Sequence, residues 1–206
     1  EVKEKNINIV GTDGHRLSFT SSELVAPSKA TQVIIPRKTI VELVKLLNDT
    51  DDPLEISFSN NQVNFKFSDI DLITKVIDGK FPDYSRVIPD GHGNIFNINR
   101  ALLLESMLRA SILSNDKYRG IRMVVEENNL KLVSNNSEQE QAEEQLEIEY
   151  KGEKIDIGFN VTYLIDVLMN IQSDQLTIAF SDSNSSCLVT IPNNKKYKYV
   201  VMPMRI

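Results

Sequence analysis

The chain has 206 residues, enough for one large domain or two of about 100 residues, and either size can bury a core. Hydrophobic residues make up 41% and charged residues 25%, no run approaches the roughly 18 apolar residues of a membrane span, and no charged-then-apolar leader opens the chain, so we expect a soluble cytosolic protein. The formal charge of −6 argues against a protein that coats nucleic acid by bulk attraction, so any contact with nucleic acid needs a local basic face.

The first distinctive stretch is Gly11-Thr12-Asp13-Gly14-His15-Arg16-Leu17. It lies between two short alternating segments, residues 6–10 and 17–20, that are typical of strands, so we predict an exposed turn. Asp13 and Gly14 are residue types that favour tight turns. Two interpretations stay open here: a plain hairpin turn with solvated His15 and Arg16, or a recognition surface.

A pattern of one strand, one helix and three strands occurs three times along the chain. Pro36 suits the start of the first helix, because its missing N–H would be unpaired there. The expected elements are a strand at 31–35, a helix from Pro36 with apolar residues up to Leu47, and strands at 54–58, 63–67 and 72–76; a strand at 95–98, a helix at 101–113, and strands at 120–125, 130–133 and 145–150; and a strand at 154–158, a helix at 161–171, and strands at 176–180, 187–191 and 199–202.

The repeat also predicts the domain organisation. The second and third copies can cover each other's apolar faces and form one domain of about 110 residues, from about Asn94 to Ile206. The first copy lacks such a partner, because residues 1–25 supply only strands. Either the chain is a fragment whose missing part held the partner, which the opening Glu1 without an initiator Met favours, or the first copy is buried on another surface. Residues 83–93 contain Pro and Gly and few apolar residues, so we expect them to connect the domains.

Common catalytic and metal-binding patterns are missing from the sequence. His15 and His92 lack partners at the spacings of zinc sites, and there is no GxSxG, phosphate-binding glycine loop or GxGxxG. Cys187 lies in an apolar alternating segment without a second cysteine, which indicates a buried structural thiol. His15 with Asp13 or Asp83 would form an acid–base pair only if the fold brought them together, so an enzyme is the weakest alternative.

Three further features each have a bland and a functional interpretation. The acidic run within residues 138–149 is either a solvated loop and strand edge or a docking face for a basic partner. Arg37, Lys38 and Lys45 lie between the apolar positions of the first helix and are either solvated or able to follow phosphates. The tail Met202-Pro203-Met204 either ends a core strand or lines a peptide groove, since Met side chains adapt to varied apolar partners.

Four short motifs, in order, carry a resemblance to a known family. They are Thr12-Asp13-Gly14-His15-Arg16-Leu17, Phe81-Pro82-Asp83-Tyr84 with Arg86-Val87, Gly158-Phe159-Asn160-Val161, and Val200-Val201-Met202-Pro203-Met204-Arg205. Because the motifs are spread over nearly the whole chain, the match is specific: the chain resembles the bacterial DNA polymerase III beta subunit family, the sliding clamps. The repeat agrees, because that family is built from duplicated units of helix and sheet.

The resemblance implies an α+β fold, the DNA-clamp fold, in which repeated strand-helix-three-strand units place helices on one face of antiparallel sheets. Members of the family have three similar domains, and two chains close head-to-tail into a ring around duplex DNA. Residues 1–89 resemble the second half of the middle domain, and residues 90–206 resemble the third domain. The implied function is a DNA polymerase processivity factor, an accessory subunit without enzymatic activity, cofactor or metal.

The resemblance also implies a pocket that receives short linear motifs from the DNA polymerase III alpha subunit, the clamp loader and repair polymerases. We expect Leu17, Val87 and Met202 to bury the apolar end of the motif and Arg16 to fix its polar start. The full set of expected pocket residues is Thr12, Gly14, His15, Arg16, Leu17, Pro82, Arg86, Val87, Asn160, Tyr163, Ser186, Met202, Pro203, Met204 and Arg205. Asn184 stands where the family often has a small apolar residue, so we expect a reshaped rim there.

Two further surfaces follow from the resemblance. Arg37 and Lys38 match positions that face the hole of the ring, where contacts with phosphates are independent of base sequence. The residues that match the homodimer interface are Ile112, Leu113, Glu138, Glu140, Glu143 and Glu144. A net negative ring fits this function, because topological linkage keeps DNA in place without tight binding. The alternative is a repeat-built protein-interaction module without a DNA role.

Overall fold

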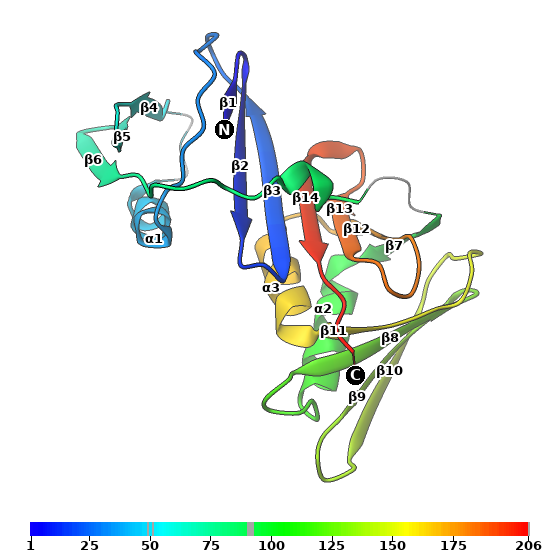
Figure 1. The fold of residues 1–206 in the computed structure, drawn as a ribbon. Coiled ribbons are helices and arrows are strands. Elements are labelled where there is room, and N and C mark those ends of the chain that lie inside the picture. The colour runs from blue at the N-terminus through cyan, green and yellow to red at the C-terminus, as the bar shows by residue number, and fades with distance from the viewer. Residues whose placement is uncertain (49, 51, 90–92, 206) are drawn as a thin grey trace. The chain divides into compact units, whose positions relative to one another are not determined.

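The computed structural model describes residues 1–48, 50, 52–89 and 93–205, and the chain divides into two compact units (Figure 1). The first unit holds Glu1–Ile7 and Glu23–Asp83, and the second holds Asn8–Ser22 and Tyr84–Ile206. Residues 90–92 of the expected connection, His92 among them, lie outside the described residues. No helix of the described part of the chain is long and apolar enough to cross a membrane.

The first unit combines one helix with a three-stranded antiparallel sheet. Its elements are β1 (Val2–Lys3), which pairs with the start of β2, α1 (Arg37–Leu46), β4 (Glu55–Phe58), β5 (Gln62–Phe67) and β6 (Ile70–Lys75). β5 is the central strand, and its Val63, Phe65 and Phe67 form a buried cluster with Leu43 of α1. The predicted helix and the three strands that follow it are confirmed to within two residues at each end.

The prediction of a strand at residues 31–35 is wrong. Thr31 makes only an isolated bridge to Val2, and the carbonyl of Ile34 accepts a hydrogen bond from the backbone N–H of Ile77 at 2.8 Å. Val33 and Ile35 pack, partly buried, against the cluster of α1 and β5. The β-branched residues that suggested a strand therefore fill space between elements, while their backbone makes single bonds rather than a ladder.

Most apolar residues of α1 stay exposed. Leu43 is 7% exposed, whereas Val41 is 42% and Val44 66% exposed. An amphipathic helix normally buries such a stripe against a second layer. Among the residues of the first copy that the structure describes, there is no second helix that could cover this stripe.

The second unit contains two complete copies of the predicted repeat. Its elements are β2 (Asn6–Thr12, from Asn8 on), β3 (Arg16–Glu23, up to Ser22), the 3-10 helix η1 (Tyr84–Arg86), β7 (Asn94–Asn99), α2 (Arg100–Ser111), β8 (Gly120–Glu126), β9 (Asn129–Asn135), β10 (Gln141–Glu147), β11 (Ile155–Asn160), α3 (Val161–Asn170), β12 (Gln175–Phe180), β13 (Cys187–Ile191) and β14 (Asn194–Val201). The side chains of Asn99 and Asn160 accept hydrogen bonds from the first turns of α2 and α3, which fixes where both helices begin.

Two antiparallel sheets and the helix pair enclose the core of this unit. One sheet runs in the order β2-β3-β14-β13-β12-β7, and the other runs β10-β9-β8-β11. α2 and α3 lie side by side (Figure 1), α2 packs on β9 and β10, and α3 contacts β11 and β14. Phe96, Phe159 and Phe180 are among the largest fully buried side chains. The predicted α+β architecture is therefore confirmed.

Cys187 lies in this core, and burial raises the pKa of its thiol, as expected for a structural cysteine.

The acidic stretch lies on a strand that begins earlier than predicted. β10 covers Gln141–Glu147 rather than residues 145–150. Ile148 and Tyr150 suggested a strand because they are apolar, but they are buried after β10 has ended, where Ile148 N donates to the carbonyl of Asn128 at 3.2 Å. These two residues are therefore apolar because they fill the core, and not because they belong to a strand.

Candidate functional site

The turn between β2 and β3 is shorter than predicted and is built around Asp13. Only residues 13–15 lie outside the two strands. One carboxylate oxygen of Asp13 accepts the backbone N–H groups of His15 at 3.0 Å and of Arg16 at 3.1 Å. Gly14 has φ +88°, a conformation that glycine adopts without steric cost. Thr12 adds a second support, because its hydroxyl donates to the carbonyl of Arg16 at 2.7 Å and accepts the Gly14 N–H at 3.2 Å.

Arg16 ties this turn to α3. Its Nε donates to Asp13 at 3.0 Å, its Nη1 donates to Asp166 at 2.6 Å, and its guanidinium carbon lies 4.5 Å from the ring centre of Tyr163. Burial opposes the charge of Arg16, but the bonds to Asp166 and Asp13 outweigh it and raise its pKa. These two bonds use two of the five N–H donors of a guanidinium, so about three remain for a ligand.

The same hydrogen bonds act on Asp13 in the opposite direction. Burial disfavours its carboxylate, but the hydrogen bonds from His15 and Arg16 outweigh burial and hold the pKa of Asp13 below its ordinary value. The turn is therefore held by a carboxylate that is ionised near neutral pH.

Sequence reasoning included Tyr163 and missed Asp166. Both lie on α3 and are three residues apart, so they share one face of the helix. That spacing was readable from the sequence. The identity of the partner was not, because Arg16 and Asp166 are 150 residues apart along the chain.

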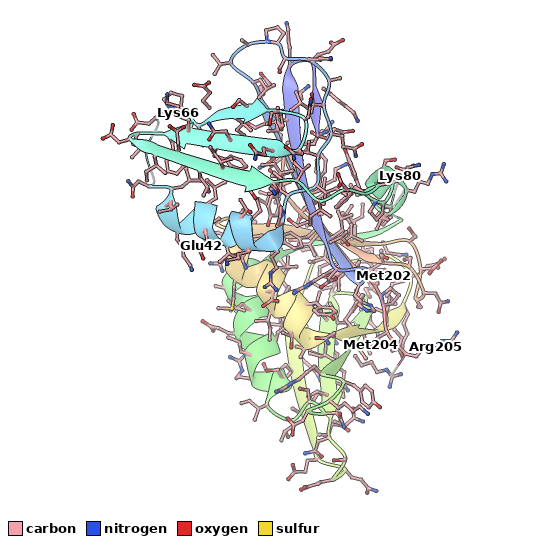
Figure 2. All side chains as sticks on the ribbon, turned by 60° about the vertical axis from the view of Figure 1, so that its left-hand side comes forward. Glu42, Lys66, Lys80, Met202, Met204 and Arg205 are labelled. Atoms are coloured by element: carbon pink, nitrogen blue, oxygen red, sulfur yellow. The ribbon has the colours of Figure 1, made fainter. Side chains whose placement is uncertain are left out.

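The tail after β14 is bonded to the turn. Leu17 of β3 pairs with Val200, and Met202 N donates to the carbonyl of His15 at 2.9 Å. The ring centres of His15 and Tyr163 are 6.3 Å apart, and the two rings are stacked. Further along, Met204 N donates to the carbonyl of Gly158 at 2.8 Å, so the tail is fixed at two points. Met202 is 45% exposed, and Figure 2 labels it with Met204 and Arg205 on this tail.

A small apolar cluster lies next to the turn and the tail. Its buried members are Leu17, Ala179, Leu188 and Val200. Tyr84 and Ile88 pack on it from the segment around η1. The ring centres of Tyr84 and Phe19 are 5.8 Å apart. Leu17 is only 2% exposed and belongs to this cluster, whereas Val87 and Met202 offer accessible apolar surface.

Within the second unit, direct contacts join six of the fifteen expected pocket residues, namely Thr12, Gly14, His15, Arg16, Tyr163 and Met202. Leu17 pairs with Val200. Asn160 caps α3, Ser186 precedes β13 and is half-buried, Pro203 and Met204 are half-buried, and Arg86 and Arg205 are exposed. Pro82 is exposed and belongs to the first unit.

The residues expected at other surfaces are also accessible. Arg37 and Lys38 are exposed in the first turn of α1, and Lys45 pairs with Glu42 at 3.1 Å. Ile112 follows α2 and is 76% exposed, and Leu113 is half-buried.

Two of the four acidic residues of the expected interface, Glu143 and Glu144, lie on opposite faces of β10, and the other two precede the strand. Glu144 pairs with Arg109 of α2 at 2.7 Å, and Glu143 pairs with Lys131 of β9 at 2.7 Å. Each of these cations holds the pKa of its carboxylate below the ordinary value. Glu138 and Glu140 lie on the exposed turn before β10, where Glu140 accepts a hydrogen bond from Asn136. Half of this acidic set is therefore already neutralised within the chain.

The contact between Arg16 and Asp166 can be measured in isolation. In a double-mutant cycle with Arg16→Gln and Asp166→Asn, we expect a coupling of about 0.5–1 kcal/mol in the free energy of unfolding, since both groups are partly exposed. Urea denaturation of the four variants gives this value. The matched cycle with Asp174→Asn, in the exposed loop after α3, should give no coupling with Arg16. A coupling near zero for Asp166 would show that the ion pair does not hold the turn on α3.

Comparison with protein-family models matches almost the whole chain. The model for the DNA polymerase III beta subunit, central domain, matches residues 1–83. The model for the C-terminal domain of the same subunit matches residues 85–205.

Curated relatives and solved structures agree with these matches. The beta sliding clamp of Pseudomonas aeruginosa is 44% identical over 207 residues, and that of Escherichia coli K12 is 39% identical over 206; both alignments cover 100% of this chain. The crystal structure of the P. aeruginosa DNA polymerase III subunit beta has a TM-score of 0.95 at 44% identity over 99% of this chain and 56% of that chain. A P. aeruginosa clamp bound to griselimycin has a TM-score of 0.96 at 44% identity, over 100% of this chain and 56% of that chain. The chain spans 56% of the length of the two curated relatives.

Proposed function

The chain belongs to the DNA polymerase III beta subunit family, the bacterial sliding clamps, and from this premise we propose that it is part of a processivity factor for DNA replication. The intact protein would close as a homodimeric ring around duplex DNA in the cytoplasm and tether polymerases without catalysing a reaction itself. Within it, residues 1–89 would form the second half of the middle domain and residues 90–206 the third domain. The matches of the two family models support this assignment.

The partner site of this clamp would lie at the turn of residues 13–15 and the tail after β14. The observation that carries this assignment is the backbone bond from Met202 to His15, which holds two distant segments together beside accessible apolar side chains. The neighbouring apolar cluster and the few fixed polar groups suit a short linear motif from the DNA polymerase III alpha subunit, the clamp loader or repair polymerases. The P. aeruginosa clamp solved with griselimycin supports a ligand-binding role for this fold. We expect micromolar affinity, because a flexible segment gives up conformational entropy on binding.

Arg37 and Lys38 would contact DNA phosphates from the first turn of α1. No acidic residue lies in that turn, and cations near a helix N-terminus oppose the helix dipole, a small cost that contact with phosphates would offset. Such contacts carry no base specificity. With a chain charge of −6 the protein would hold DNA weakly and be able to slide.

Ring closure would depend mainly on apolar contact at Ile112 and Leu113. Ile112 is 76% exposed at the end of α2, an unusual position for a large aliphatic side chain unless a partner covers it. β10 is nearby as an edge strand of its sheet. Glu143 and Glu144 have cations within the chain, so Glu138 and Glu140 would contribute more of the charge offered to a partner subunit.

Retention on circular DNA tests the clamp function directly. After loading by a bacterial clamp loader, the intact protein should stay on a nicked circular plasmid and should be lost within minutes once the plasmid is linearised. Gel filtration of the DNA-bound fraction measures this. Equal retention on circular and linear DNA would indicate ordinary binding, and no retention on either would favour a protein-interaction module without a DNA role.

A further inference from the structure

A polar groove crosses the face of the sheet β10-β9-β8-β11 that is turned away from α2. It has a volume of about 1300 Å³. Its floor consists of alternate residues of β8 and β9, such as Val124 and Val133, whereas the residues between them, such as Met123 and Leu132, are buried in the core. Since successive strand residues point to opposite faces, this floor is the outer surface of the sheet. None of the expected DNA or dimer contacts lies among its lining residues.

The groove is positively charged on a protein that is negatively charged overall. Four lining residues are basic, namely Arg122, Lys131, Lys154 and Arg205, and two are acidic, namely Glu126 and Asp156. The lining therefore carries a net charge of +2, from four minus two, whereas the whole chain carries −6. Such a local reversal of sign favours an acidic ligand.

Ion pairs hold three of these four cations in place and offset part of their charge. Arg122 makes a two-pronged contact with Asp156 at 2.6 and 2.5 Å, and Lys154 pairs with Glu126 at 2.5 Å. Lys131 pairs with Glu143, which lies outside the lining, and with Glu143 counted the net charge falls from +2 to +1. The side chains of Arg122 and Lys154 are still 57% and 62% exposed, so they remain accessible to a second anionic partner.

One end of the groove lies next to the proposed peptide-binding pocket, which the turn of residues 13–15 and the tail after β14 would form. Pro203, Met204 and Arg205 line the groove, and they directly follow Met202 of that pocket. The bond from Met204 to Gly158 places the tail alongside β11. The tail is three strand spacings from β9, because β11 and β8 lie between them. Three spacings are about 14 Å, which about four extended residues can span. A segment leaving the pocket can therefore reach Lys131.

We propose that this groove binds an acidic stretch that flanks the pocket motif in the same partner protein. The inference rests on the proposed function, because the motif in the pocket supplies the anchor. Polar side chains at the far end of the groove, including Asn135 and Gln141, accept a hydrophilic segment without requiring an apolar anchor. The groove would thereby distinguish partners that share the motif but differ in flanking charge.

The test compares five peptides by fluorescence polarisation on the intact protein. One carries only the clamp-binding motif of a bacterial DNA polymerase III alpha subunit, and the others add about five acidic or about five neutral polar residues, at either end in turn. We expect the acidic extension, at one end, to tighten binding about three- to tenfold at about 50 mM salt, with most of the gain lost at about 300 mM.

Variants locate the effect. Lys131→Gln with Lys154→Gln brings the net charge of the lining to zero and should reduce the gain to less than about twofold. Lys195→Gln with Lys196→Gln removes the same charge at the exposed start of β14, outside the groove, and should leave the gain intact. Both double variants should bind the motif-only peptide normally, which also verifies their folding.

Three outcomes would overturn the inference: no gain from an acidic extension at either end, the same gain from the neutral extension, or the same gain on the groove variant. Failure of the motif-only peptide to bind the unaltered protein would instead refute the pocket, so the two failures are distinguishable.

Discussion

Replacing Met202 with Ala, together with Arg16→Ala, is expected to weaken binding of a clamp-binding peptide by about 30-fold or more, equivalent to about 2 kcal/mol. Met202 offers accessible apolar surface on the tail, and its removal takes contact area from the ligand. Arg16 acts differently, because its guanidinium joins Asp13 to Asp166 and so positions the turn. Fluorescence polarisation with a labelled peptide measures the loss.

A matched methionine variant separates this effect from general destabilisation. Met169 is 65% exposed on α3, and none of the contacts that join the proposed pocket residues involves it. Met169→Ala should therefore bind the peptide like the unaltered protein. If the Met202 and Arg16 variant kept its affinity while thermal melts showed a normal fold, the pocket would lie elsewhere on the molecule.

The second large effect is expected on assembly. In the intact protein, Ile112→Asp should raise the dimer dissociation constant by about 100-fold or more, because a charge would be buried without a partner in an apolar contact. Ile112 is exposed within the chain, so the substitution should leave the protomer folded. Analytical ultracentrifugation over a range of protein concentrations gives the dissociation constant.

Leu102→Asp, on the helix α2 that Ile112 follows, is the control for this change. Leu102 is 56% exposed and ten residues from Ile112, about 15 Å along the helix axis. The Leu102→Asp variant should therefore have an unchanged dimer dissociation constant. A dimer that tolerates Ile112→Asp, or the milder pair Ile112→Ala and Leu113→Ala, would rule out this surface as the ring interface.

The sequence determined the order and type of most elements, because their signals are local. Alternation identified β5 and β12 nearly to the residue, and Asn99 and Asn160 stand where α2 and α3 begin. The failures came where apolar residues serve packing rather than periodicity, as at residues 31–35 and after β10. In both places tertiary contacts, which are not written locally, decided the backbone conformation.

The candidate site shows the same division. The motif from Thr12 to Leu17 was recognisable in the sequence, and so was the unusual tail around Met202. Only the tertiary structure showed that the backbone of Met202 donates to that of His15 and that Arg16 donates to Asp166. It also showed that Leu17 is buried. The physical reason is that side-chain hydrogen bonds and ion pairs act over a few ångströms, whereas the residues that make them are up to about 190 positions apart. Residue chemistry is therefore fixed by the sequence, and its partners are fixed by the fold.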